Sequence, residues 1–175
     1  MQILKMLEAG HSKKQTGEIV NFIGSDQKKF NELFSLFMRA EDKIVQRAAW
    51  PVSYAVIANP FFINKHYKSL FKKLDDPTQH EAVARNIMKM ISEIDDYPKK
   101  YHGMLIHHCL RFVEGPKTKI SVQAYSLRAL ANLCKWYPEI IPEVKLVLNE
   151  RLPTATPSYA TSARNFLKAI KKFNK

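Results

Sequence analysis

One short stretch of the chain carries the residue types that bind metals and act as nucleophiles. His107, His108 and Cys109 are consecutive, and His102 precedes them by five residues. Neighbouring residues of a helix point about 100° apart, so consecutive side chains do not easily converge on one ion. A reactive thiol needs a polar and partly open setting, whereas apolar residues flank Cys109 on both sides. We therefore expect neither a metal site nor a thiol nucleophile here.

Two aspartate doublets are the second motif that could do chemistry, because paired carboxylates serve general acid–base catalysis. Asp75-Asp76 and Asp95-Asp96 each lie just before a proline, at an expected helix boundary. Aspartate is a preferred helix cap, and Asp76 with Gln79 also has the spacing of a capping box. The chain has no glycine-rich phosphate loop and no dinucleotide fingerprint. We expect no enzymatic activity and no cofactor.

The composition fits one domain over residues 1–175 that is rich in helix. The chain has only five glycines, which suits helices better than turn-rich sheets. No apolar run reaches the roughly 20 residues of a membrane span, and the first residues lack the layout of a signal peptide. We expect a cytoplasmic protein that does not enter a membrane. Its two cysteines, Cys109 and Cys134, are expected to be free and buried.

The net charge of +12 is unevenly distributed. Residues 1–88 hold 13 basic and 9 acidic side chains, and residues 89–175 hold 15 and 7. A basic surface attracts anionic partners such as nucleic acid or acidic proteins. It also occurs as a solvated face without a partner, so charge alone leaves both interpretations open.

An internal repeat indicates the architecture. "ARNIMKMI" begins at Ala84 and "ARNFLKAI" at Ala163, with "AYSLRALANL" at Ala124 between them and a weaker copy, "AWPVSYAVI", at Ala49. The copies are 35 to 40 residues apart. Self-similarity at such a period is typical of helical repeat arrays.

Prolines and capping residues divide the chain into helices, and no stretch alternates as a strand does. Pro51 lies inside one of these helices and predicts a kink or a break there. We expect an all-α chain of about four helical hairpins, at about 25–59, 60–96, 97–137 and 138–175, after an N-terminal helical cap at 1–24. The predicted helices are 11–23, 26–39, 42–58, 60–74, 77–95, 98–113, 117–136, 138–151 and 157–172.

Two segments resemble a HEAT repeat. "LFKKLDDPTQHEAVARNIMKMI", from Leu70 to Ile91, has an apolar first helix, a turn with aspartate, and valine and arginine ahead of an apolar second helix. "LFSLFMRAEDKIVQRAAW", from Leu33 to Trp50, is similar, whereas the later hairpins lack the aspartate turn. The resemblance implies a right-handed α-α superhelix, a HEAT-like solenoid whose second helices line a concave face. It also implies a non-enzymatic scaffold that binds a protein partner.

On a helical wheel, the polar side of each second helix carries basic or aromatic residues. Aromatic and arginine side chains are enriched in binding hot spots, and they also suit phosphates and stacked bases. The alternative is that the aromatic residues pack under the N-terminal cap and the basic ones are merely solvated. The predicted partner-binding column consists of Arg47, Trp50, Tyr54, Arg85, Lys89, Tyr125, Arg164 and Lys168.

Three functions fit this column. The first is a scaffold for a protein partner, with Trp50, Tyr54, Arg85 and Tyr125 as hot spots. The second is nucleic-acid binding, with the basic residues, including Lys171 and Lys172, on phosphates. The third, a remote one, is suggested by DNA glycosylases built from HEAT-like repeats, but no acidic residue stands beside Trp50 or Tyr125 in the column. The identity of the partner and the oligomeric state are not indicated.

Overall fold

The structure is a computed structural model that describes residues 2–78, 80–94 and 97–173. The predicted capping residue Gln79 and the doublet Asp95-Asp96 lie outside the described residues. The described part of the chain contains ten α-helices and no strand: α1 (Gln2–Glu8), α2 (Lys13–Ile23), α3 (Gln27–Arg39), α4 (Asp42–Ala58), α5 (Tyr67–Leu74), α6 (Glu81–Glu93), α7 (His102–Glu114), α8 (Ile120–Leu133), α9 (Ile141–Arg151) and α10 (Pro157–Ile170).

The all-α prediction is confirmed, with three differences. The first helix, α1, was not predicted, so the N-terminal segment is itself a pair of helices, α1 and α2. The predicted helix 60–74 is a short 3₁₀ turn, Pro60–Ile63, followed by α5. Of the kink or break predicted at Pro51, the break is wrong, because α4 runs through this proline without interruption, and the kink stays a prediction. Ala49 and Val52, on either side of Pro51, are buried, and this packing outweighs the one backbone hydrogen bond that a proline removes.

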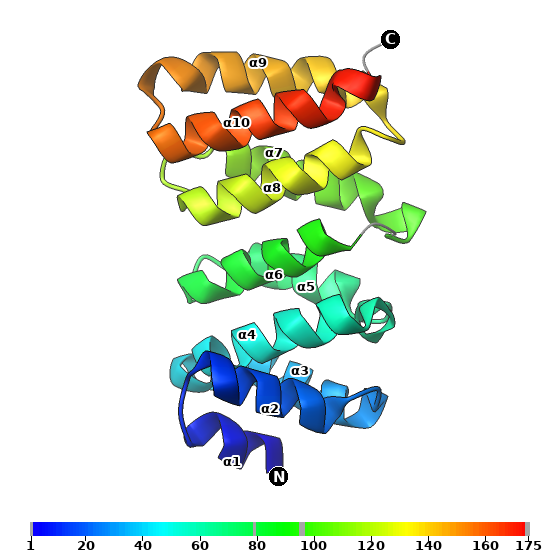
Figure 1. Cartoon of the computed structure of the whole chain (residues 1–175), viewed down its shortest axis with the longest axis vertical. Helices are drawn as coiled ribbons and strands as arrows, with labels where there is room; N and C mark the ends of the chain where they lie inside the picture. Colours follow the sequence, from blue (N-terminus) through cyan, green and yellow to red (C-terminus); the bar gives the residue numbers. More distant parts are fainter. Residues whose placement is uncertain (1, 79, 95–96, 174–175) are drawn as a thin grey trace. The chain divides into compact units, whose positions relative to one another are not determined.

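The chain forms two compact units, residues 1–90 and 91–175. Within the first unit, α2, α4 and most of α6 form one layer, with α3 and α5 behind it (Figure 1). Within the second unit, α8 and α10 form one layer, with α7 and α9 behind (Figure 1). We call the layer of α2, α4 and α6 in one unit, and of α8 and α10 in the other, the second-helix layer. The repeat boundaries stay a prediction.

Apolar periodicity explains why these helices pack. In α3, Phe30, Leu33 and Phe37 lie on one face of the helix and are fully buried. The Phe30 ring stacks on Phe62, with 4.5 Å between the ring centroids. Complete burial of such a side chain contributes about 1.5–3 kcal/mol. Asp26 caps α3 by accepting hydrogen bonds from two backbone N–H groups, and these bonds lower the pKa of its carboxyl.

His102, Cys109 and Cys134 of the second unit are all buried. His102 is buried, with its ring nitrogens 3.1 Å from the hydroxyl of Tyr137 and 2.9 Å from the carbonyl of Tyr97. Cys109 and Cys134 are free and buried, as predicted, and burial raises the pKa of both thiols. Among the described residues, no three histidines, cysteines or acidic residues gather as a metal site would require. No helix among the described residues of either unit has the length and apolarity needed to cross a bilayer.

Candidate partner-binding surface

The eight residues of the predicted column all lie on the second-helix layer, but they divide between the two units. The first unit holds five of them, on α4 and α6, and the second holds three, on α8 and α10. Tyr54, Arg85, Arg164 and Lys168 are exposed, whereas Arg47, Trp50, Lys89 and Tyr125 are half-buried. We therefore describe the surface of each unit separately.

A groove of about 350 Å³ runs between α2 and α4 in the first unit. This volume is at the small end of the ~300–1,000 Å³ range of ligand clefts. Its walls are largely apolar and aromatic on the α4 side. We call it the α2–α4 groove, and it is lined by Lys13, Thr16, Gly17, Val20, Asn21, Trp50, Tyr54, Ile57 and Ala58.

The contribution of α2 to this groove was missed in the sequence. Thr16 and Gly17 share one face of α2 with Val20, which follows them by four and three positions. Gly17 has no side chain, and a Cβ added there would meet nothing within 4 Å. The groove exists partly because a side chain is missing from this wall. The one available signal was a glycine in the middle of a predicted helix, which usually lowers helix stability and invites a functional explanation.

Trp50 and Tyr54 are the aromatic residues of the α2–α4 groove. They are one turn apart on α4 and keep solvent contact, so neither is fully covered by the N-terminal helices. Tyr54 is 40% exposed. The Trp50 ring lies against the exposed His11, with 5.2 Å between the ring centroids. Two partly exposed aromatic rings beside an open groove are a common feature of protein-binding sites.

Cations lie beside the aromatic wall. Lys13 is one of the lining residues, and Nζ of Lys89 lies 3.8 Å from the centroid of the Tyr54 ring. This is a cation–π contact, which contributes roughly 0.5–1 kcal/mol at an exposed site. Arg85 lies one turn before Lys89 on α6 and is exposed. Positively charged side chains therefore lie on both sides of the groove.

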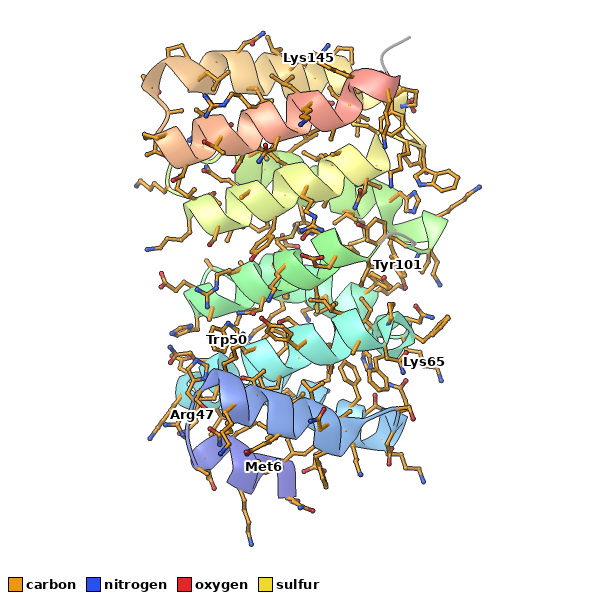
Figure 2. All side chains as sticks on the ribbon, viewed as in Figure 1. Met6, Arg47, Trp50, Lys65, Tyr101 and Lys145 are labelled. Atoms are coloured by element: carbon orange, nitrogen blue, oxygen red, sulfur yellow. The ribbon has the colours of Figure 1, made fainter. Side chains whose placement is uncertain are left out.

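Arg47 has a structural function in addition to any role in binding. Its guanidinium donates hydrogen bonds to the carbonyls of Leu7 and Glu8, at 3.0 and 2.8 Å. These carbonyls end α1, where cations interact favourably with the helix dipole. Figure 2 shows Arg47 beside the N-terminal helices. Arg151 does the same in the second unit, donating to the carbonyls of Val113 and Glu114 at the end of α7.

The second unit has a smaller groove, of about 250 Å³, between α8 and α10. Tyr125 lines it, as predicted, but most of its other residues are small or polar. The cation in its wall, Arg128, forms a bidentate ion pair with Glu93, at 2.7 and 3.0 Å. We call it the α8–α10 groove, and it is lined by Ala124, Tyr125, Arg128, Ala131, Ser162, Asn165, Phe166 and Ala169.

Four exposed basic residues of the second unit lie on α10 and in the short turn that follows it. Arg164 and Lys168 lie one turn apart and are exposed, and Lys171 and Lys172 follow in a 3₁₀ turn. The guanidinium of Arg164 donates a hydrogen bond of 3.0 Å to the hydroxyl of Thr161. The sequences of α8 and α10 contain no acidic residue. The charged residues that these two helices contribute are therefore all basic.

The described lining of both grooves contains no aspartate or glutamate. A DNA glycosylase of the HEAT-like class needs a catalytic carboxylate beside its aromatic residues, and neither groove provides one. What the two grooves offer is apolar contact, hydrogen-bonding groups and positive charge. These are features that a binding surface uses.

Three comparisons with known proteins were made. A family model described as HEAT repeat domain matches residues 3–170. Neither the comparison with curated proteins nor the comparison with solved structures gave a match. The matched region covers every α-helix of the second-helix layer, from α2 to α10, and both grooves.

Proposed function

Because the chain belongs to the HEAT repeat domain family, we propose that it is a non-enzymatic scaffold that binds a protein partner with its second-helix layer. HEAT repeats are helical scaffolds that commonly mediate protein interactions, but the family does not identify a partner. The α2–α4 groove is the primary contact in this proposal. The observation that carries it is the pair of partly exposed rings, Trp50 and Tyr54, in the wall of an open apolar groove. We retain a cytoplasmic location as a prediction.

The rigidity of the site supports this function. Trp50 and Tyr54 are on a helix of 17 residues whose opposite face is buried, so little conformational entropy is lost when they bind. Ser53, between them in sequence, is fully buried and donates a hydrogen bond to the Trp50 carbonyl at 3.0 Å. Aromatic anchors held in one position are typical of interfaces whose energy is concentrated in a few residues.

A pair of glycine variants tests this function. Gly17→Leu adds a side chain to the α2–α4 groove without removing any contact, and Gly103→Leu makes the same change on α7. A Cβ at either glycine meets nothing within 4 Å, and both changes replace a poor helix former by a good one. Both variants are therefore expected to fold.

The measurement has two steps. Proteins that the tagged chain retains from cells are identified and purified, and each is titrated calorimetrically against wild type, Gly17→Leu and Gly103→Leu. Binding that is lost in Gly17→Leu and kept in Gly103→Leu supports the proposal. Equal binding of a purified partner to all three proteins would place the contact elsewhere. The absence of any protein that binds after purification would contradict the scaffold function.

Nucleic-acid binding is the second candidate, and the basic residues of α10 favour it. Arg164, Lys168, Lys171 and Lys172 are exposed, and no acidic residue of α8 or α10 offsets their charge. Contacts to phosphates release counterions, so the affinity would fall steeply with salt. Anisotropy of labelled DNA and RNA over a salt series tests this, with Arg164→Glu/Lys168→Glu as the variant. Tight binding near physiological salt that this variant abolishes would support the second candidate over the first.

A further inference from the structure

We infer that the α2–α4 groove binds a short acidic segment of a partner protein, anchored by an apolar side chain. This inference rests on the proposed function and gives the chemistry of the partner. Two features of the groove support it. Its apolar space of about 350 Å³ can take a large side chain, and cations lie on both sides of this space.

The apolar anchor follows from the groove walls. Val20, Trp50 and Ile57 present aliphatic or aromatic surface from two helices, and Gly17 leaves the space between them open. Burial of apolar surface contributes about 25 cal/mol per Å², so a large side chain gains most from this space. Thr16 and Asn21 add hydrogen-bonding groups near the walls, as expected for a site that also fixes the orientation of a bound chain.

The acidic character follows from charge complementarity. Lys13 contributes to the lining of the groove on the α2 side, and Lys89 lies over the Tyr54 ring on the α4 side. Arg85 extends the positive charge by one turn along α6. The acidic residue of α2, Glu18, is not among the lining residues. A carboxylate beside the anchor would find cations on both sides of the groove, whereas a basic segment would be repelled.

The α8–α10 groove provides an internal contrast. It is smaller, at about 250 Å³ against about 350 Å³, and the cation in its described lining, Arg128, is held by Glu93 through two hydrogen bonds. Beside Tyr125 and Phe166, the described lining consists mainly of small or polar residues, among them Ala124 and Ala169. An acidic segment with an apolar anchor would therefore gain less in this groove, and the α2–α4 groove is the better site for it.

Trp50 is a built-in reporter of occupancy. The chain has two tryptophans, and Trp136 is 59% exposed, so Trp136→Phe leaves Trp50 as the single tryptophan at little cost to the fold. Three synthetic peptides are titrated into this protein: one with a phenylalanine among aspartates and glutamates, one with alanine in place of the phenylalanine, and one with lysines in place of the acids. An oligothymidylate serves as the nucleic-acid probe.

The expected result is that the acidic phenylalanine peptide alone shifts the Trp50 emission to shorter wavelength and saturates. Its affinity falls at least about tenfold with Gly17→Leu and about tenfold with Lys13→Glu/Lys89→Glu, and it weakens with added salt. Gly103→Leu binds as well as the parent protein. Circular dichroism confirms that each variant is folded.

Several results would overturn the inference. Equal binding of the lysine peptide would remove the charge argument, and equal binding of the alanine peptide would remove the anchor. A Trp50 response to oligothymidylate alone would place nucleic acid in the groove. A purified partner that loses binding in Gly17→Leu, while the acidic peptide does not bind, would retain the scaffold function and reject the acidic segment.

Discussion

The α2–α4 groove and the α8–α10 groove each lie between two successive helices of the second-helix layer of their own unit. Each contains a tyrosine from the second helix of a repeat, Tyr54 in one and Tyr125 in the other. In the first groove a tryptophan adds to the tyrosine, and a lysine lies over the ring. In the second groove the other ring, Phe166, is buried, most of the remaining lining is small or polar, and the arginine is held by a glutamate. The repeat builds the same helical frame twice, and the residues that differ between copies determine what each frame can bind.

The repeated tripeptide Ala-Arg-Asn shows the same division of roles. Arg85 and Arg164 are both exposed, as the wheel predicts. Asn86 is buried, and its amide donates to the Ala82 carbonyl at 2.8 Å, whereas Asn165 is exposed in the α8–α10 groove. Identical residues therefore have a structural function in one unit and a surface position in the other.

The largest expected effect is on binding to the first groove. Trp50→Ala should weaken a bound partner, or the acidic peptide, by at least about 2 kcal/mol, which is roughly thirtyfold, because a central aromatic anchor is lost. Tyr125→Ala should change the same affinity less than about threefold. Calorimetric titration of both variants measures the difference. Because Trp50 also packs on His11, thermal melts must show that Trp50→Ala is folded; similar losses in both variants would remove the distinction between the grooves.

The fold could be predicted from the sequence almost completely, because helices follow from local apolar periodicity and capping. Residues 42–58 were predicted as one helix, and α4 has these bounds. The missed helix, α1, has only seven residues and two buried positions, Ile3 and Leu7. Two positions are too few to reveal a helical period in the sequence. Of the kink or break predicted at Pro51, the break failed because local propensity does not include the tertiary packing that holds α4 together.

The site could be predicted only in part. Trp50 and Tyr54 lie on the polar face of α4, and Lys89 lies on the polar face of α6. Both faces can be identified from apolar periodicity, which is why these residues could be predicted as neighbours. Arg47 binds carbonyls 39 and 40 residues away, a pairing that no local pattern contains. The contribution of α2 was missed because the groove there depends on the lack of a side chain at Gly17. Hydrophobic patterns in a sequence show where side chains pack, and they do not show where space is left open.

The second prediction concerns the two asparagines. Asn86→Ala should lower the free energy of unfolding by about 1–3 kcal/mol, because Asn86 is 2% exposed and its hydrogen bond to the Ala82 carbonyl is lost. Asn165→Ala, at an exposed position, should change it by no more than about 0.5 kcal/mol. Denaturant titrations monitored by circular dichroism make the comparison. Equal effects of the two changes would show that the repeated asparagines are equivalent after all.

The third prediction uses pH to distinguish the second unit from the first. Burial raises the pKa of the Cys134 thiol from 9.0 to about 11, so the unfolded chain loses this proton at lower pH than the folded chain. The protonated thiol therefore contributes fully to the free energy of unfolding below pH 9, and this contribution is lost as the pH rises toward 11. From pH 8 to pH 10 it amounts to roughly 1 kcal/mol.

The free energy of unfolding is measured over the same pH range for the cysteine protein and for Cys134→Ala. The difference between the two series isolates the effect of the thiol, because all other ionisable side chains are common to both proteins. Unfolding is followed by Trp136 in a Trp50→Phe background for the second unit, and by Trp50 in a Trp136→Phe background for the first. The extra pH dependence of the cysteine protein should appear in the Trp136 transition. Its appearance with equal size in the Trp50 transition would indicate that both units unfold as one.

The smallest expected effect concerns the ion pair that distinguishes the two grooves. Glu93→Gln removes the carboxylate that holds Arg128, and the exposed position of this pair limits the loss in stability to about 0.2–1 kcal/mol. The same change releases a guanidinium in the wall of the α8–α10 groove, where a carboxylate of an acidic peptide could replace the lost partner. Calorimetry in the Gly17→Leu background, with the first groove blocked, should then show weak binding of the acidic peptide that Arg128→Ala abolishes. If Glu93→Gln gains no such binding, the small and polar walls of the second groove, rather than its ion pair, account for the difference between the two grooves.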